Sequence, residues 1–236
     1  MRLLIIRHGD PDYEHDSLTP KGWREANLLA DRLEKLTVCR FYCSPCGRAR
    51  DTAKETLRRA RREATICGWL REFPAQILDP ETGKPRIPWD LMPEYWTARG
   101  GLYDKDRWYD DPLMRTGDVR ERYREVAQGL DGVLAEHGYR RDGMIYRAER
   151  PNRDILVFFC HLGAEGVMLS HLLGISAPVL WHGTFIAPTS VTTIVTEERK
   201  RGIAAFRCRT IGDTSHLSRA GEPVSDSGLF PETWQG

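Results

Sequence analysis

The sequence lacks long hydrophobic runs and lacks an excess of charge of either sign. Its most apolar run, residues 155–160, is far shorter than the ~20 apolar residues that cross a membrane. The apolar stretch after Met1 is also too short for a signal peptide, so we expect a cytoplasmic protein with no membrane partner. With 35 basic and 34 acidic residues the net charge is +1, which removes the general electrostatic reason to expect a nucleic-acid partner.

Repeats are absent as well, and the cysteines do not indicate a disulfide framework. No period recurs along the 236 residues, and a hydrophobic content of 40% is sufficient for one α/β domain, 1–236, with an insertion. The pair in Cys43-Ser44-Pro45-Cys46 has the spacing of a redox or zinc site, but no second pair exists, so metal or redox use is the lesser alternative. The six cysteines mostly lie in or beside expected strands, which favours reduced, buried thiols: Cys39, Cys43, Cys46, Cys67, Cys160 and Cys208.

Charge is concentrated in one place, the basic run at residues 58–62. This run ends the helix that we expect to begin near Arg48, and cations complement the carbonyl end of a helix. We therefore interpret it as a solvated helix terminus, with a polyanion-binding patch as the alternative.

Two apolar segments end in a histidine that is followed closely by glycine. Residues 3–6 precede Arg7-His8-Gly9, and residues 155–160 precede His161-Leu162-Gly163. The carboxyl ends of strands in open α/β sheets are where ligands bind. A guanidinium beside an imidazole suits a phosphoryl group that must be held and attacked, so this pattern points to phosphate chemistry.

A third segment, residues 43–53, reads as a strand end, a turn at Pro45 and then a helix with Arg48 in its first turn. The helix macrodipole disfavours a cation at that place. Arg48 therefore indicates an anion shared between its side chain and the backbone donors of the helix start, with an exposed arginine as the alternative.

Together these segments resemble the histidine phosphatase superfamily, which includes the cofactor-dependent phosphoglycerate mutases. The resemblance implies that His8 is the phosphorylated nucleophile and Glu72 the proton donor, while Arg7, Arg48 and His161 surround the phosphoryl oxygens. The matching positions run in order along the chain: Arg7-His8-Gly9, Ser44-Pro45, Arg48-Ala49, Thr52-Ala53, Glu72 and His161, with softer matches at 18–22, 189–192 and 213–217.

The chemistry of phosphoryl transfer supports the same roles. The protein has mainly to align the nucleophile with the leaving group and to neutralise the charge on the phosphoryl oxygens. Arginines offer paired donors to those oxygens, and His8 beside them attacks as a neutral imidazole, so we expect no metal and no cofactor. A carboxylic acid must protonate the leaving alkoxide and later activate water. Glu72 is the first choice for this acid, and four other carboxylates compete with it: Asp10, Asp12, Glu14 and Glu165.

Departures from the family pattern reduce the number of activities that we expect. Leu162 follows His161, whereas the acid phosphatase and phytase branch has an aspartate there as proton donor. The extended substrate segments of the mutases are also missing, because Phe73-Pro74-Ala75 follows Glu72 and Asp10-Pro11-Asp12 follows Gly9. We therefore expect a metal-independent phosphomonoester hydrolase whose partner is a small phosphate ester; a mutase and a non-catalytic phosphate-binding protein are the alternatives.

The order of expected elements indicates a three-layer α/β/α sandwich around a mostly parallel sheet. Helices are expected at 20–36, from Arg48 to 62, at 113–137 and at 162–173, and strands at 3–6, 38–43, 64–70, 155–160, 191–196 and 203–211.

Residues 79–111 interrupt this alternation with tryptophans and tyrosines among prolines and glycines. We interpret them as a cap or lid over the site, with a local core or a homodimer contact as the alternative. Arg99, Lys105 and Arg107 offer cations for a second anionic group of the substrate. Residues 218–236, rich in glycine, proline and serine, are expected to form a loosely ordered extension.

Overall fold

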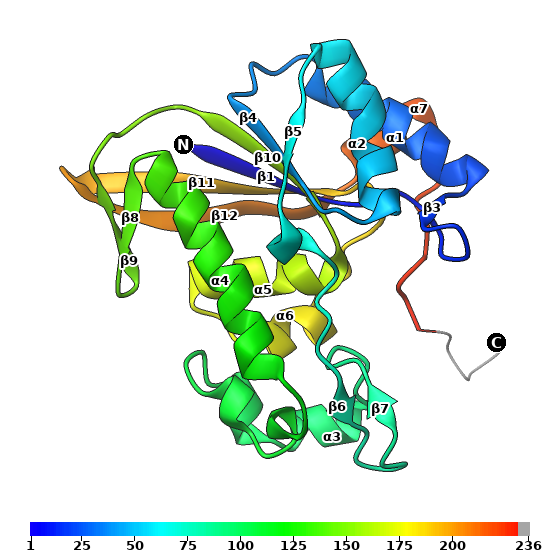
Figure 1. Ribbon diagram of the computed structural model, residues 1–236, viewed down its shortest axis with the longest axis vertical. Helices are drawn as coiled ribbons and strands as arrows, with labels where there is room; N and C mark the ends of the chain where they lie inside the picture. Colours follow the sequence, from blue (N-terminus) through cyan, green and yellow to red (C-terminus); the bar gives the residue numbers. More distant parts are fainter. Residues whose placement is uncertain (231–236) are drawn as a thin grey trace.

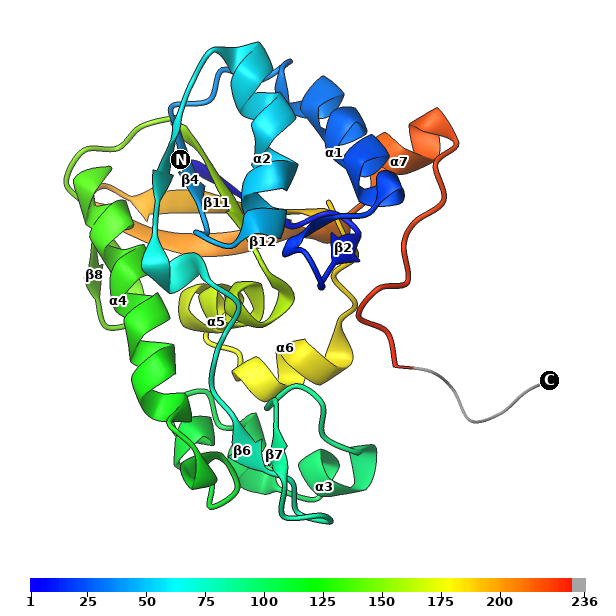
Figure 2. The same ribbon diagram turned by 45° about the vertical axis from the view of Figure 1, so that its right-hand side comes forward.

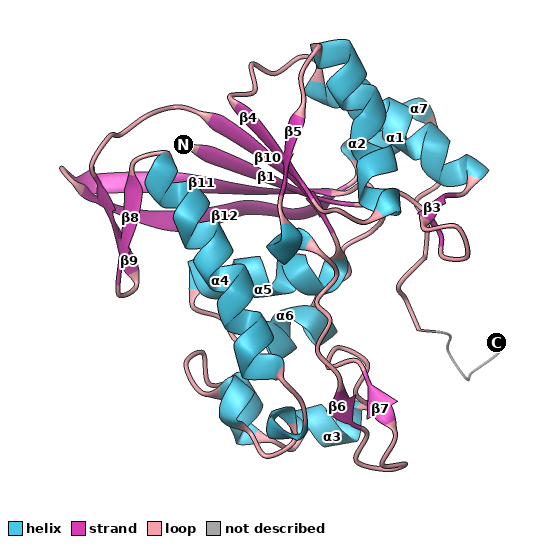
Figure 3. Ribbon diagram, in the orientation of Figure 1, coloured by secondary structure: helices cyan, strands magenta, loops and turns pink. Residues whose placement is uncertain are grey.

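The computed structural model describes residues 1–230; residues 231–236 lie outside the described part. The described residues form a central sheet with helices on both faces, so the predicted three-layer α/β/α architecture is confirmed (Figures 1 and 3). Across the sheet the strands follow the order β5 (Ala64–Ile66), β4 (Arg40–Cys43), β10 (Ile155–Cys160), β1 (Arg2–Arg7), β11 (Val191–Lys200), β12 (Ile203–Asp213), β9 (Ile145–Ala148) and β8 (Tyr139–Asp142).

Strands β1 and β10, which carry the two histidines at their ends, are neighbours in the middle of the sheet. They pair in parallel, and Arg7 lies opposite Cys160. Each strand is apolar on both faces because both faces are covered. Leu3 and Ile5 point to one core and Leu4 and Ile6 to the other, as the alternation of strand side chains requires.

The sheet is mixed, which corrects the expectation of a mostly parallel one. Strands β5, β4, β10 and β1 run parallel, whereas every pair from β1 through β11, β12 and β9 to β8 is antiparallel. Two-residue turns join β11 to β12 and β8 to β9, and a turn that short cannot lead into a parallel strand. Gly202 and Gly143 adopt positive φ in these turns (79° and 61°).

Helices α1 (Pro20–Leu33), α2 (Gly47–Ala60) and α7 (Ser215–Ala220) lie on one side of the sheet. Helices α4 (Val119–Glu136), α5 (Leu162–Leu173) and α6 (Ala177–Gly183) lie on the other, as the turned view shows (Figure 2). Within residues 1–230, no helix combines the length and the apolar composition that crossing a membrane requires.

Three predicted boundaries were wrong, each for a local reason. Helix α1 ends at Leu33, and a tight turn replaces its expected last residues. Strand β5 stops at Ile66, where residues 68–70 begin a 3₁₀ turn. Helix α4 starts at Val119 instead of residue 113 because Gly117 is extended there, where a Cβ atom would lie 1.7 Å from the carbonyl oxygen of Gln76. The hairpin β8–β9, polar and half exposed, had no recognisable sequence pattern.

The aromatic segment 79–111 contains short elements and belongs to the same core as the helices above it. Strand β6 (Ile77–Leu78) lies directly before it, and the segment itself contains β7 (Pro85–Arg86), α3 (Pro93–Thr97) and 3₁₀ turns at Gly100–Tyr103 and Trp108–Asp110. Trp108 is fully buried, with its ring edge-on to Trp181 of α6 at 5.4 Å and to Tyr123 of α4 at 5.5 Å. The segment therefore forms a fixed extension below α6.

Residues 221–230 make specific contacts, where the sequence predicted a loosely ordered extension. Glu222 pairs with Lys21 at 3.3 Å and with Arg24 at 3.1 Å, and Ser225 donates a hydrogen bond to Asp10. These contacts bind the tail to α1 and lead it past α6 toward the carboxyl edge of the sheet (Figure 2). The remainder of the predicted extension, 231–236, lies outside the described residues.

Candidate functional site

The parallel register of β1 and β10 places His8 and His161 together at the carboxyl edge of the sheet. The backbone N–H of His8 donates to the carbonyl of Cys160 at 3.0 Å, and the two imidazole rings lie 5.1 Å apart between centroids. Both side chains are buried. The sequence reasoning that two strand ends would meet here is therefore confirmed by geometry.

His8 is held as a neutral imidazole with one nitrogen free. Its Nδ1 lies 2.8 Å from the carbonyl oxygen of Gly9, so Nδ1–H donates and the lone pair resides on Nε2. Burial, reinforced by the charge of Arg7, lowers the pKa of His8 to about 3. At neutral pH the ring is therefore uncharged and chemically capable of nucleophilic attack through Nε2.

Ser44 selects the tautomer of His161. The Ser44 hydroxyl accepts from the backbone N–H of Cys46 at 3.2 Å and lies 2.8 Å from His161 Nε2. If the hydroxyl donates its one proton to Nε2, the other ring nitrogen, Nδ1, carries hydrogen. Burial, next to His8, lowers the pKa of His161 well below its usual value, so this tautomer is neutral. Sequence reasoning had Ser44 only as a motif match and missed this role.

Arg7 and Arg48 flank the two histidines. Arg7 donates from Nη1 to the carbonyl of Ile186 at 2.7 Å, and Arg48 donates from Nη1 to Asp16 at 2.6 Å. Among the described residues, Nε of each arginine and Nδ1 of His161 are buried nitrogen atoms without a hydrogen-bond partner. The two Nε–H groups are donors, and His161 Nδ1 is a third donor in the tautomer in which Ser44 donates to Nε2. Buried donors without partners are unfavourable, so an oxyanion ligand would satisfy them.

The start of α2 holds an anion of the chain itself. Asp16 accepts from the backbone N–H of Gly47 at 2.6 Å as well as from Arg48. The sequence argument expected a bound anion beside Arg48 and did not anticipate that the Asp16 carboxylate lies there. Asp16 adopts a positive φ of 46°, and a loop residue in that conformation carries no sequence signal.

The Glu72 side chain lies beside the N-terminus of α5, the helix that begins directly after His161. Its Oε1 accepts from the backbone N–H groups of Phe73 at 2.8 Å and Gly163 at 2.9 Å. A Cβ atom on Gly163 would lie 2.7 Å from this oxygen, so glycine is required there. Burial raises the pKa of Glu72, while the backbone donors and Arg7 oppose part of the rise.

The other carboxylates considered from the sequence are placed elsewhere. Asp10 accepts from Thr19 at 2.6 Å and from Ser225, while Asp12 pairs with exposed His15 at 2.9 Å and Glu14 is exposed. Of the five candidates, Glu72 alone lines the pocket that contains Arg7.

That pocket, of about 710 Å³, is bounded by segments far apart in sequence. Residues 86–93 and Trp96 come from the aromatic segment, residues 181–185 from the end of α6 and its loop, and residues 228–230 from the tail. A Cβ atom on Gly228 would lie 2.9 Å from both terminal nitrogens of Arg7, so the tail backbone lies against the guanidinium. Residues of the aromatic segment and of the tail thus border the pocket that contains Arg7 and Glu72.

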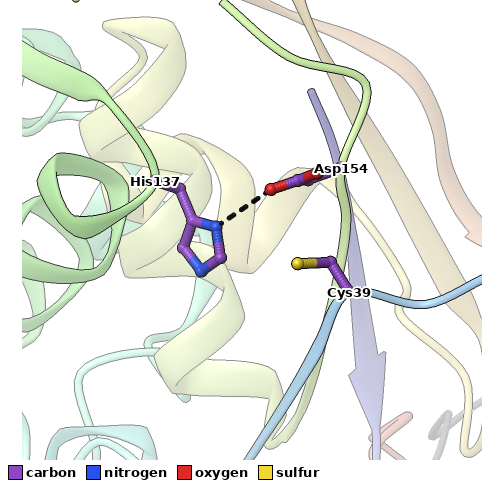
Figure 4. Close-up of side chains that lie close together, drawn as sticks. All are labelled: Cys39, His137 and Asp154. Atoms are coloured by element: carbon purple, nitrogen blue, oxygen red, sulfur yellow. Dashed lines mark hydrogen bonds and ion pairs between the residues drawn. The ribbon is translucent and has the colours of Figure 1, made fainter. Parts of the chain in front are cut away.

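Two other clusters are not part of this site. Cys43 is buried, and burial raises the pKa of its thiol to about 12, which disfavours a reactive thiolate at Cys43; all six cysteines are free. Cys39, His137 and Asp154 offer donor atoms within 4.8 Å of one another at the opposite ends of β4 and β10 (Figure 4). There His137 Nδ1 pairs with Asp154 at 3.3 Å and Nε2 with the Tyr42 hydroxyl at 3.1 Å, so both ring nitrogens already have partners.

The fold and site together define an α/β protein with two buried histidines and two arginines at the carboxyl edge of its sheet. The chain belongs to the histidine phosphatase superfamily (branch 1), whose profile matches residues 3–209. No curated protein matches the sequence.

Solved structures with a similar fold include three phosphatases. Phosphoserine phosphatase from Entamoeba histolytica is 20% identical with a TM-score of 0.60, covering 92% of this chain and 98% of that one. Mycobacterial glucosyl-3-phosphoglycerate phosphatase is 19% identical with a TM-score of 0.58, covering 90% of this chain and 99% of that one. Alpha-ribazole phosphatase from Shigella flexneri is 18% identical with a TM-score of 0.56, covering 90% of this chain and 96% of that one. At these identities the likeness establishes the shared fold.

Glu165, on helix α5, allows the effect of burial on the pKa of a carboxyl group to be tested. It is fully buried in α5, and burial raises its pKa from 4.5 to about 8, although Thr192 and Arg7 oppose part of the rise. The folded protein keeps a proton that the unfolded chain releases, so the free energy of unfolding falls as pH rises between these values. For Glu165→Gln we expect this loss between pH 5 and 8 to shrink by about 2–4 kcal/mol in urea unfolding.

The matched control is Glu14→Gln, which removes an exposed carboxylate and should leave the pH dependence of the unfolding free energy as in the parent. Comparing each variant with itself at the two pH values cancels the constant effect of a buried amide. An unchanged pH slope in Glu165→Gln would show that this carboxyl is already ionised in the folded protein.

Proposed function

We propose that this protein is a metal-independent phosphomonoester hydrolase that acts on a small phosphorylated metabolite through a phosphohistidine at His8. The observation that carries the proposal is the free Nε2 of a neutral His8 among three buried donors from Arg7, Arg48 and His161. The arginines supply the positive charge that the phosphoryl oxygens need. The solved structures of similar fold are phosphatases of small phosphate esters, which supports hydrolysis.

In the first step His8 Nε2 attacks phosphorus, and the bond from phosphorus to the ester oxygen breaks. Glu72, whose pKa burial raises, gives its proton to the departing oxygen, so the alcohol leaves neutral. In the second step water attacks phosphohistidine while the Glu72 carboxylate takes its proton. Inorganic phosphate leaves, and both side chains return to their starting states.

Hydrolysis is favoured over mutase chemistry by the residues that follow Glu72 in the chain. A mutase must hold the dephosphorylated intermediate for rephosphorylation at a second position, which requires fixed polar contacts to that intermediate. Here the residues after Glu72 are Phe73 and Pro74, and Phe73 is buried against Trp181 at 5.4 Å. The alcohol is therefore free to leave.

The phosphohistidine can be trapped. Acid-sensitive, base-stable label should appear on the protein when it is mixed with a labelled phosphomonoester and quenched in base, and His8→Ala should carry none. His15→Ala, which removes an exposed histidine, should label normally. Label that moves between substrate positions without release of phosphate would instead identify a mutase, and a protein that never takes up label would be a binding protein.

The proton donor has its own test. Glu72→Gln should lower kcat for alkyl phosphates ~100-fold or more, because an alkoxide leaves poorly without a proton. Aryl phosphates, whose phenolates leave unassisted, should slow far less. Glu14→Gln should leave both rates unchanged. Equal slowing of alkyl and aryl substrates in Glu72→Gln would assign the role to another carboxylate.

A further inference from the structure

The part of the pocket beyond the oxyanion site is lined mainly by aromatic and aliphatic side chains. Trp89 packs against Trp181 at 5.7 Å between centroids, and Trp96 stacks on His182 at 5.0 Å with an interplanar angle of 18°. The apolar lining continues through Ile87, Leu91, Met92, Pro93, Phe185, Leu229 and Phe230. Met92, Leu229 and Phe230 are 45%, 52% and 58% exposed and all belong to this one lining, so they extend its apolar surface to solvent.

The polar side chains of this region are engaged with one another. Arg86 Nε pairs with buried Asp79 at 2.6 Å, and its Nη1 donates to the carbonyl of Asp90 at 2.9 Å. His182 Nδ1–H donates to the Pro178 carbonyl at 2.8 Å, and burial lowers the pKa of the ring. His182 is therefore neutral, and Arg86 is already neutralised by an acid of its own chain.

The cations that the sequence offered for a second anionic group do not line the pocket. Arg99 pairs with Asp111 at 3.2 Å, and Lys105 pairs with Asp106. Arg107, too, is absent from the pocket lining, whereas Asp90 is part of it and adds negative charge. A carboxylate on the leaving group would therefore meet no unpaired cation beyond Arg7 and would face an acid.

We infer that the alcohol portion of the substrate is a flat, apolar group, and that the protein selects phosphate esters of aromatic alcohols over phosphorylated carboxylic acids. This inference rests on the proposed hydrolysis at His8 and assigns the substrate class of the same pocket. The tryptophan faces and the exposed side chains of the lining contact the ring. Apart from Arg7, which the phosphoryl group occupies, the described lining offers no unpaired cation and so rejects a second negative charge.

The test compares two primary alkyl phosphates that differ only at the far end of the leaving group, 2-phenylethyl phosphate and 3-phosphopropanoate. Both leave as ordinary alkoxides, so the comparison reports the pocket and not leaving-group reactivity. We expect kcat/KM for the phenyl ester to exceed that for the carboxylate by ~30-fold or more. The phenyl ester buries its ring in the pocket, whereas the carboxylate ester leaves its second charge unpaired.

A variant whose selectivity is expected to shift toward the carboxylate gives a second test. Met92→Lys places a cation on an exposed wall position and should lower the phenyl-to-carboxylate ratio of kcat/KM by ~10-fold or more. Met144→Lys makes the same change at a methionine of similar exposure, 43%, in the β8–β9 turn away from the pocket, and should leave the ratio as in the parent.

Trapping of the phosphohistidine distinguishes failure of the proposed hydrolysis from failure of the proposed substrate class. If neither ester labels His8 or releases phosphate, the proposed hydrolysis is wrong. If both are hydrolysed through labelled His8 and the carboxylate is equal or preferred, the hydrolysis stands and the aromatic substrate class is overturned. A ratio that shifts as much in Met144→Lys as in Met92→Lys would likewise overturn the assignment of this wall.

Discussion

The parallel pairing of β1 with β10 is the constraint on which the site depends. Because Arg7 lies opposite Cys160, the next residue of each strand is a histidine, and the two rings meet at the edge where the sheet ends. A shift of one residue would turn every side chain of the strand to the other face of the sheet. Continuous burial on both faces fixes the register, so packing of the core also sets the distance between the imidazoles.

Around that pair, backbone groups hold the reactive side chains. The carbonyl of Gly9 fixes the proton of His8, and the N–H groups of Phe73 and Gly163 hold the Glu72 carboxyl at the start of α5. Backbone donors and acceptors in regular elements move little, so these groups are positioned before any ligand arrives. Burial then acts in opposite directions, since it lowers the pKa of His8 and raises that of Glu72. One environment thereby favours the neutral form of both side chains.

The sequence predicted the parts of the molecule that arise from strong local patterns. Apolar strands followed by His8 and His161 are such a pattern, and so is the Thr19 cap before Pro20, whose hydroxyl accepts from Gly22 at 3.1 Å. The partnership of Asp16 with Arg48, the hairpin β8–β9 and the contacts of residues 221–230 depend on residues that meet only after folding. Polar turns and tails carry no period, so nothing in their composition specifies a partner.

The tail has a consequence for how members of this superfamily can be compared. The family profile covers residues 3–209, whereas Gly228 lies against Arg7 and Phe230 borders the mouth of the pocket. A match confined to residues 3–209 leaves these two pocket residues out, so two proteins that match the profile equally well can differ at the entrance of the pocket. Resemblance to the profile therefore describes the sheet and the side chains at its carboxyl edge, whereas the contribution of residues 228–230 has to be read from the structure.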